Sequence, residues 1–393
     1  MKGVVVSHKP CWKSVSSPSG YATDGGFPMQ MAAISAIFDE TVLLVPVDRR
    51  SSPDGEMPLT GHNLRVRPLN PPLGTGWRRK AGMLWFALRH GPVLLREILR
   101  ADAVHTPIPG DVGTIGMLAA FALRKPLFVR HCGNWLAPKT ATERFLKWFM
   151  ERFAGGRNVM LATGGRPEPP SSRNPRVQWI FSTSLTEKEL NQTARPRNIT
   201  DGQSHARLII ACRQDEAKGT GRVIAALPLT MRGFPDATLD VVGDGPDLPR
   251  FRALAAEAGV ARRVRFHGKV GHQRVLELLN QAELFCYPTA SEGFPKAVLE
   301  ALACGLPVVT TPVSVLRSLI AGGGGVLLDN TTPECIAQAV VRCFRSPDSY
   351  RAMSERAIET ARSYSLESWR DSIRRTLEAA WGLPCRTNSI SGG

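Results

Sequence analysis

Long apolar runs are missing from this sequence of 393 residues. No stretch approaches the roughly 20 consecutive apolar residues that a membrane-spanning helix needs. The opening residues, Met-Lys-Gly-Val-Val-Val-Ser, are typical of a short strand and lack the apolar segment of a signal peptide. We therefore expect a protein of the cytoplasm.

Metal-site and dinucleotide motifs are missing as well. The eight cysteines are scattered, with no C-x-x-C pair and no spacing typical of metal ligands. Several lie in apolar stretches, which predicts buried, reduced thiols. The sequence contains no G-x-G-x-x-G fingerprint. We therefore expect no cysteine-based metal site and no dinucleotide cofactor.

What is present is typical of a globular protein with more than one core. The chain is 43% hydrophobic and 21% charged, which excludes a disordered protein. Its length suggests two domains of ordinary size. Runs rich in Val, Ile and Leu alternate with helical patterns, which indicates the α/β class.

Positive charge is in excess and unevenly distributed. The net charge is +16, and residues 1–182 carry 24 Lys and Arg against 12 Asp and Glu. Residues 183–393 carry 26 against 22. This asymmetry predicts an anionic partner for the first half: a membrane surface, a phosphate-bearing acceptor or nucleic acid.

The first half of the chain alternates between strand-like and helical patterns. We expect strands at 3–6, 41–47, 103–105 and 127–130, and helices at 29–38, 80–100, 113–123 and 142–153. Residues 50–76 and 167–176 are rich in proline and other turn-forming residues, which predicts irregular loops. This order is typical of a doubly wound domain.

The second half continues the alternation. We expect strands at 208–212, 238–242, 264–267 and 326–328, and helices at 248–257, 273–279, 333–344 and 348–361. The predicted organisation is a domain over 1–193, a polar linker over 194–204, a domain over 205–363, a final long helix over 364–381 and a tail over 382–393. The tail is expected to be disordered.

Residues 284–311 carry the most informative pattern: a strand, a loop with glycine and proline, a helix, a glycine stop and a second strand. Pro295 suits the first helical position, where a missing N–H costs nothing. Gly305 and Pro307 end the helix. Unpaired amides of the first helical turn form an anion site, and Glu300 could reach back to a ribose diol. The pattern predicts a cradle for a nucleotide sugar.

The run from Ser291 to Val309 resembles the E-x7-E block of retaining GT-B glycosyltransferases of the large family four, with Glu292 and Glu300 as its glutamates. An ordinary amphipathic helix with two surface glutamates is the alternative. The resemblance covers roughly residues 205–315 well and the first half in outline. It implies two doubly wound Rossmann-like domains with a C-terminal crossover helix, retention of configuration and no bound metal.

The resemblance also implies how the donor is held. Glu292 would orient the sugar hydroxyls, and Glu300 would bind the ribose. The start of the helix would contact the nucleotide through Gly293, Phe294, Pro295, Lys296, Ala297 and Val298.

Two cations precede this block. Arg213 follows an expected strand, and Lys218 comes at the start of the next helix. Such a pair can clamp a diphosphate and stabilise its growing negative charge, and it resembles the family's Arg…Lys-Gly element. Two solvated surface charges are the alternative.

Further candidates are weaker. The turn Val241-Val-Gly-Asp-Gly-Pro-Asp247 resembles the family's Gly-x-Gly-Pro turn, where Gly243 and Gly245 would allow positive φ or close approach of the ligand. His267, at the end of an expected strand, is a candidate neighbour of the base. A plain turn and a structural histidine are the alternatives.

In the first half, Gly26 belongs to a glycine loop that resembles the one approaching the donor phosphates or the acceptor. His131 follows a strand, where many relatives place a histidine that faces the transferred sugar. His105 is the competing choice, and a structural role for either histidine stays open.

Two amphipathic stretches, 78–100 and 139–157, interleave aromatic and basic residues. This is typical of helices at a membrane interface, although packed core helices give the same pattern. The residues chosen as a membrane anchor are Trp77, Arg78, Arg79 and Lys80. No nucleic-acid-binding motif accompanies them.

Together these patterns predict a metal-independent retaining glycosyltransferase with Arg213, Lys218, Glu292 and His131 as catalytic residues. The donor would be a UDP- or GDP-sugar, and the acceptor a saccharide or a lipid-linked molecule. The expected place is the cytoplasm, with the inner face of the cell membrane as a docking surface. The rivals are a nucleotide-sugar epimerase, another GT-B enzyme such as a phosphorylase, and a basic nucleic-acid-binding protein.

Overall fold

The structure is a computed structural model that describes residues 1–48, 56–74 and 76–382. The chain divides into two units. The first unit contains Met1–Thr163, Pro167–Ile180 and Glu367–Gly393, and the second contains Gly164–Arg166 and Phe181–Leu366. The predicted tail over 383–393 lies outside the described residues.

The first unit is built on one mixed sheet with the strand order β10-β9-β8-β7-β1-β4, extended by β2, β3 and β5, while β6 also pairs with β4. All pairings are parallel except those of β3 with β2 and β5. The strands are β1 Lys2–Val6, β2 Cys11–Lys13, β3 Tyr21–Thr23, β4 Glu40–Asp48, β5 Met57–Pro58, β6 Leu64–Leu69, β7 Ala103–Ile108, β8 Leu127–His131, β9 Asn158–Thr163 and β10 Val177–Ile180.

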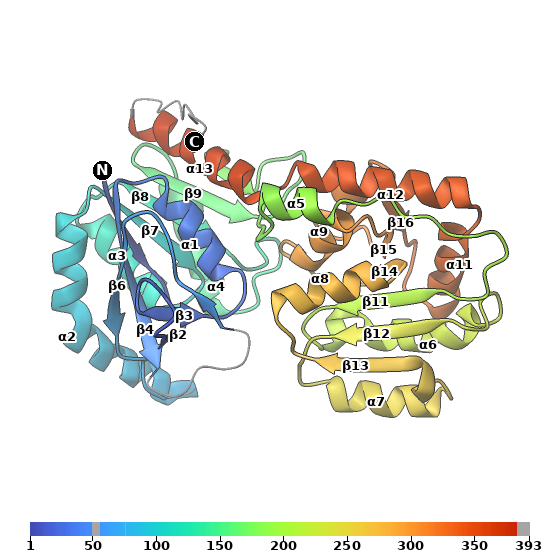
Figure 1. Cartoon of the computed structure of the whole chain (residues 1–393). Coiled ribbons are helices and arrows are strands. Elements are labelled where there is room, and N and C mark those ends of the chain that lie inside the picture. The colour runs from blue at the N-terminus through green and yellow to red at the C-terminus, as the bar shows by residue number, and fades with distance from the viewer. Residues whose placement is uncertain (49–55, 75, 383–393) are drawn as a thin grey trace. The chain divides into compact units, whose positions relative to one another are not determined.

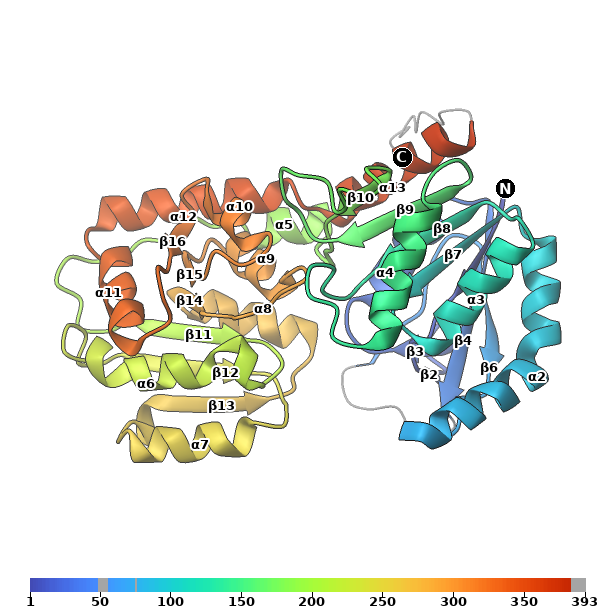
Figure 2. The same ribbon diagram turned by 180° about the vertical axis from the view of Figure 1, so that it is seen from behind.

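Helices cover both faces of this sheet. Figure 2 shows α4 (Ala141–Phe153), α3 (Asp111–Ala122) and α2 (Gly76–Arg100) side by side on one face, where their apolar side chains form the main core of the unit. On the other face lie α1 (Phe27–Ser35) and α13 (Leu366–Trp381), joined by a hydrogen bond from Arg374 to the carbonyl of Ala36 (3.0 Å). This is the doubly wound arrangement that the sequence predicts.

Part of the segment 50–76 is ordered where the sequence predicted irregular loop. Leu64–Leu69 is a strand, β6, paired in parallel with β4 from Thr41↔Leu64 to Pro46↔Leu69. That prediction was therefore wrong for these residues. Proline is tolerated here because β6 pairs on one side only within the described chain, so Pro68 needs no second ladder partner.

The second unit contains a fully parallel sheet in the order β13-β12-β11-β14-β15-β16. Its strands β14 and β15 and most of β11 are nearly continuous apolar runs, as expected for the buried centre of such a sheet. They are β11 Arg207–Ala211, β12 Thr238–Val242, β13 Val264–Gly268, β14 Leu284–Tyr287, β15 Val308–Thr310 and β16 Gly325–Leu327.

Helices flank this sheet on both sides (Figures 1 and 2). In Figure 1, α8 lies in front of the sheet and α6 behind it. The helices are α5 Glu187–Thr193, α6 Thr220–Thr230, α7 Leu248–Glu257, α8 His272–Gln281, α9 Lys296–Ala303, α10 Leu316–Ile320, α11 Pro333–Cys343 and α12 Pro347–Arg362, with 3-10 turns at Glu216–Lys218 and Ala261–Arg263.

The unit boundaries differ from the predicted ones. Helix α5, placed by the sequence in the first domain, belongs to the second unit because Leu185 and Leu190 are buried in that unit's core. The final helix begins at Leu366, and from Glu367 onward it belongs to the first unit. There Trp369 is fully buried under the Arg130 guanidinium, 5.0 Å from the ring centroid.

None of the helices in the described part of the chain combines the length and the apolar character needed to cross a bilayer.

Candidate active site

The strand order of the second unit places its candidate residues together. The order reverses between β11 and β14, so the loops after these two strands diverge at the carboxyl edge of the sheet. Ligands of open α/β sheets bind at such a switch point. The loops concerned are residues 212–219, after β11, and residues 288–295, after β14.

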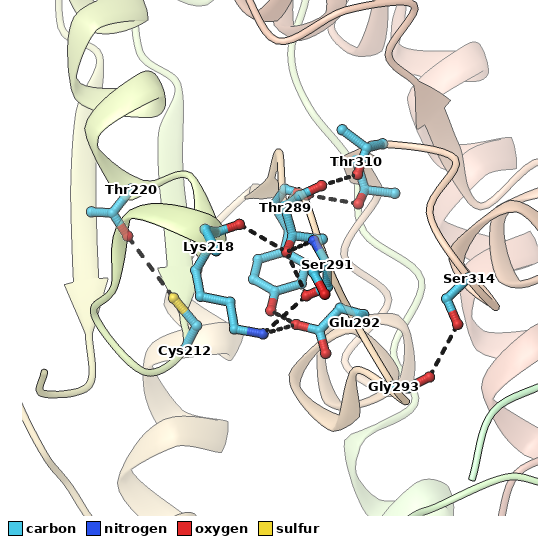
Figure 3. Close-up of polar contacts among 12 residues, drawn as sticks. Cys212, Lys218, Thr220, Thr289, Ser291, Glu292, Gly293, Thr310 and Ser314 are labelled. Atoms are coloured by element: carbon cyan, nitrogen blue, oxygen red, sulfur yellow. Dashed lines mark hydrogen bonds and ion pairs between the residues drawn. The ribbon is translucent and has the colours of Figure 1, made fainter. Parts of the chain in front are cut away.

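Lys218 and Glu292, predicted to act on the donor, form an ion pair across this switch point. Figure 3 shows the lysine side chain extended toward the Glu292 carboxylate. Lys218 Nζ also donates to the Ser291 carbonyl (3.3 Å), and the Tyr287 hydroxyl donates to Glu292. Burial and the charge of Glu292 raise the pKa of Tyr287, so the phenol stays protonated and holds the carboxylate.

Arg213 complements this pair. It lies on the same loop as Lys218, and its side chain is exposed and forms no hydrogen bond or ion pair with any described residue. A cation held on a sheet edge beside Lys218 is available for an anionic ligand. The loop itself is fixed, because Thr289 Oγ1 donates to the Ala217 carbonyl (3.1 Å) and the Ala290 amide donates to the same oxygen (2.8 Å).

The glycines of the turn after β12 accommodate protein backbone. Gly243 has φ +113°, and a Cβ there would lie 1.9 Å from the Cys212 carbonyl oxygen. A Cβ at Gly245 would lie 2.2 Å from the Gln214 carbonyl oxygen. Both glycines therefore allow the turn to pack against the Arg213 loop. The sequence analysis had predicted positive φ or a close approach of the ligand at these two positions.

Gln214 joins the two loops and was missed by the sequence analysis. Its side chain is fully buried, with the amide donating to the carbonyls of Cys212 (3.0 Å) and Val242 (2.9 Å). Thr220 Oγ1 donates to the side-chain oxygen Oε1 of Gln214 (2.7 Å). A glutamine between two candidate cations gives no sequence signal for such a role.

The start of α9 lies beside the Lys218–Glu292 pair. The helix begins at Lys296, so Pro295 is the cap residue and not the first helical residue as predicted. The Gly293 carbonyl accepts from Ser314 Oγ (3.2 Å), and Phe294 packs against the ring of Tyr364 (6.0 Å between centroids). Ala297 is half-buried and Val298 is buried. The first-turn amides of α9 provide the positive potential of a helix N-terminus.

Glu300 lies one turn into α9 and is not isolated. Its Oε1 is 3.6 Å from Nδ1 of His272, the first residue of α8, and the His272 Nε2 is 3.4 Å from Oε1 of Glu189 on α5. Burial raises the pKa of Glu300 above its ordinary value, against the opposing pull of the His272 and Lys296 charges. Neither His272 nor Glu189 was predicted from the sequence.

His267 has a partner within its own sheet. Its Nε2 lies 2.6 Å from Asp240 Oδ1 on the neighbouring strand β12, and both side chains are largely buried. This pair joins the edge strand β13 to the sheet. Asp240 is therefore the partner that a structural role of His267 requires. The contact of His267 with the base of the nucleotide stays a prediction.

In the first unit, the two candidate histidines occupy different positions. His131 is the last residue of β8, at the carboxyl edge of the sheet, whereas His105 lies within β7. His105 donates from Nδ1 to the Phe128 carbonyl (3.0 Å) and stacks on the Phe128 ring (4.2 Å). Burial lowers the pKa of His105 to about 3, so it is neutral and structural in its contacts.

His131 is buried as well but lies at the ligand-binding edge of its own sheet. Its ring contacts Trp135 edge to face at 5.3 Å, and its Nδ1 has no hydrogen-bond partner among the described residues. Burial lowers the pKa of His131 to about 4, with Glu143 opposing the shift. Gly26 caps α1 directly after Gly25, which has φ +69°.

Thus Lys218, Glu292, Arg213 and the start of α9 gather at one edge of the second unit, with Glu300 one turn further. Gly243 and Gly245 support the loops, and His267 pairs with Asp240 on the neighbouring strand. Gly26 and His131 belong to the first unit.

Comparison with known proteins bears on the family and the fold of the chain. The family model described as Glycosyl transferases group 1 matches residues 199–360. A D-inositol 3-phosphate glycosyltransferase of Corynebacterium urealyticum is 29% identical over 180 residues, which are 44% of this chain and 42% of that protein. The chain thus spans less than half the length of this curated relative.

Solved structures resemble the whole chain. Sucrose-phosphate synthase of Thermosynechococcus elongatus has a TM-score of 0.72 at 15% identity, covering 98% of this chain and 99% of that one. Anabaena HepE in complex with UDP-glucose has a TM-score of 0.68 at 16% identity, covering 96% of this chain and 100% of that one. At such identities the likeness concerns the fold.

The chain therefore has the GT-B fold, with two Rossmann-like units. Residues 199–360 of the chain match the family model of group 1 glycosyl transferases, a likeness that the E-x7-E block predicted.

Proposed function

We propose that this protein is a metal-independent, retaining glycosyltransferase that moves a sugar from a nucleotide sugar to an acceptor hydroxyl, in the assembly of a cell-surface polysaccharide or glycolipid. The observation that carries the proposal is the convergence of Arg213, Lys218 and the start of α9 at the switch point of a group 1 glycosyl transferase unit. A donor diphosphate bound here would meet the cations of Arg213 and Lys218 and the positive end of α9.

In the reaction, the bond between the anomeric carbon and the diphosphate oxygen breaks, and a bond forms from the acceptor oxygen to the same carbon. The departing diphosphate gains negative charge, which Arg213, Lys218 and the α9 amides stabilise. The acceptor proton passes to the departing phosphate. The acceptor oxygen therefore attacks from the face of the sugar that the diphosphate vacates. Glu292, held by Tyr287 and Lys218, orients the sugar hydroxyls.

The donor of this proposal is a UDP- or GDP-sugar, and Glu300 binds its ribose. The HepE structure, which contains UDP-glucose, supports the UDP form. The acceptor is a saccharide or a lipid-linked molecule held by the first unit, where His131 offers a neutral imidazole at the sheet edge.

A donor screen tests the proposal. UDP-, GDP-, ADP- and dTDP-sugars are added to the protein and thermal unfolding is followed. A ligand at 100 times its Kd adds about 2.7 kcal/mol of stability, so one nucleotide class should raise the Tm clearly and do so equally with and without EDTA. NMR of the product then gives the anomeric configuration.

Other outcomes would identify a rival. Conversion of the donor to an isomer without any acceptor would indicate an epimerase. Failure of every nucleotide sugar to bind, together with salt-sensitive binding of arbitrary DNA or RNA, would indicate a nucleic-acid-binding protein.

We further propose that the first unit docks on an anionic membrane surface, and helix α2 supports this. Leu84, Leu88, Leu95 and Leu99 are 44–67% exposed and fall, with the exposed Trp85, within an arc of about 100° around the helix. The buried Phe86, Leu94 and Ile98 lie on a different face. A helix with one apolar face in the core and a second one in solvent needs another apolar environment.

Basic residues border this apolar stripe. Arg89, Arg96 and Arg100 are exposed along one side of it, and the one acidic residue of α2, Glu97, is buried near Lys2 and Arg67. An apolar stripe edged by arginines matches an anionic lipid surface, with the leucines at the acyl boundary and the guanidiniums at the headgroups.

The anchor chosen from the sequence stays a prediction for three of its four residues. Side chains of Trp77, Arg78 and Lys80 lie outside the described residues. Arg79 donates to the Asp111 carboxylate (2.8 Å) and to the Pro72 carbonyl (2.7 Å), so its charge is already satisfied within the unit. The leucine stripe and its bordering arginines replace it.

A further inference from the structure

A histidine lies between two carboxylates next to the proposed ribose site. His272 Nδ1 is 3.6 Å from Glu300 Oε1, and its Nε2 is 3.4 Å from Glu189 Oε1. The three side chains are 20%, 12% and 23% exposed, so water screens their charges weakly. The Nε2 atom lies within ion-pair distance of Glu189 Oε1, and no other described side chain bonds it.

We propose that His272 is a positioning residue that, as an imidazolium, keeps the Glu300 carboxylate ionised and aimed at the ribose diol of the donor, which makes nucleotide affinity depend on pH. The inference rests on the proposed function, because it takes Glu300 as the ribose ligand. It goes beyond that function by assigning a second residue to the site and a pH window to its affinity.

Glu189 gives His272 a fixed counter-charge. Its carboxylate accepts from the Thr186 amide and hydroxyl (both 2.9 Å), and its own amide donates to Thr186 Oγ1 (3.1 Å), which is a capping box at the start of α5. A carboxylate locked in a capping box cannot follow the imidazole. The histidine is therefore held where its other nitrogen faces Glu300.

The charged groups that face His272 are Glu189 from α5 and Glu300 and Lys296 from α9. The contact with Glu189 raises the pKa of His272 above its ordinary 6.5, against burial and Lys296. Burial opposes ionisation of Glu189, yet the His272 contact and the Thr186 hydrogen bonds leave the pKa of Glu189 lowered.

These directions define a window. Burial raises the pKa of Glu300 above 4.5, so its carboxylate becomes protonated as the pH falls through that raised value. His272 loses its proton as the pH rises through its own raised value, and Glu300 and Glu189 then face each other without the cation between them. Affinity for a ribonucleoside diphosphate should be highest at a pH between the pKa of Glu300 and the pKa of His272, and it should fall at lower and at higher pH.

The test is titration calorimetry of UDP and GDP against the wild type and two variants from pH 5 to pH 9. His272→Gln should weaken the bound nucleotide about tenfold at pH 7, the size of one charge-assisted contact, and should abolish the alkaline fall. Its acid fall should move to higher pH, since the cation that favours ionised Glu300 is gone. His272→Lys, which keeps a positive charge throughout this range, should restore affinity and also lack the alkaline fall.

Controls separate this role from general effects. His205 pairs with Glu283 at 3.0 Å elsewhere in the same unit, so His205→Gln should leave the profile unchanged. The nucleotide phosphate titrates near pH ~6, but it does so equally for every variant. A 2′-deoxynucleoside diphosphate should bind more weakly and respond less to His272→Gln, because the diol contact is incomplete.

The outcomes distinguish the two levels of inference. If Glu300→Gln weakens the nucleotide and His272→Gln does not, the positioning role is wrong and the ribose role stands. If Glu300→Gln has no effect, the ribose role itself fails. If His272→Gln does not fold, the wild-type profile and the lysine variant decide, and an alkaline limb that persists in His272→Lys overturns the proposal.

Discussion

The two units hold their ionisable groups in opposite ways. In the second, charged side chains converge on one sheet edge and pair there, as Lys218 does with Glu292 and His272 with Glu300. In the first, the histidines at comparable depth, His105 and His131, are kept neutral because burial lowers the pKa of each. That unit carries exposed arginines on its surface, as on α2, while Arg130 is buried.

Under the proposed function, this difference separates a site for one fixed anion in the second unit from a site for neutral groups in the first. Paired charges at a switch point hold a diphosphate in one place and respond to its growing charge. A neutral imidazole such as His131 can accept or donate one hydrogen bond to a sugar hydroxyl without attracting phosphate. In the proposed function, the surface charge of the first unit acts on a large partner and not on the donor.

The largest effect should come from the phosphate clamp. Lys218→Ala or Arg213→Ala should reduce turnover roughly 10²-fold or more, because each removes a preorganised charge aimed at the leaving diphosphate. Steady-state kinetics with the donor found in the screen measures this. Arg232→Ala is the matched control: Arg232 is exposed and follows α6, at the opposite edge of the same sheet. Near-wild-type turnover in both clamp variants would remove the assignment.

A smaller effect is expected at the ribose. Glu300→Gln removes one charge-assisted hydrogen bond, which costs about 1.5–3 kcal/mol, or roughly 10- to 150-fold in affinity. The loss should appear for the free nucleoside diphosphate as well as for the whole donor, measured by calorimetry. Glu257→Gln, an exposed carboxylate at the end of α7, should bind normally. Unchanged affinity of Glu300→Gln for the free diphosphate would make Glu300 structural.

Local pattern predicted much of the fold and several of the residues that gather at the switch point of the second unit. Residues 284–311 contain a strand, a glycine stop and a helical period within one short stretch, so β14, α9 and β15 followed directly from it. Gly305 ends α9 with φ +68°, as expected of a glycine stop. Arg213 and Lys218 were identifiable because each flanks a strand or helix end.

Contacts between distant segments could not be predicted in this way. His272 begins α8, Glu189 belongs to α5 and Glu300 to α9, and nothing in any one segment indicates the other two. The strand Leu64–Leu69 was hidden because proline and loop-like neighbours masked its alternation, and pairing with β4 decides its conformation. The burial of aromatic residues could not be predicted either. Phe86 and Phe149 are buried, whereas Trp85 and Trp148 are exposed, although all four belong to the same pattern of interleaved aromatic and basic residues.

The smallest effects, and the sharpest test of the comparison, concern the surface of the first unit. Arg89→Gln and Arg96→Gln should each weaken binding to anionic liposomes about fivefold, since each basic residue near such a surface contributes about 1 kcal/mol. Leu84→Ser with Leu88→Ser should weaken binding further at high salt, where apolar insertion remains. Donor affinity should stay unchanged in all of them, because none lies in the second unit.

Arg232→Gln and Val341→Ser, exposed in the second unit, are the controls. Wild-type protein that fails to co-sediment, or a dimer that dissociates when the leucines are replaced, would show that α2 does not meet lipid, and the basic first unit would then serve its acceptor alone.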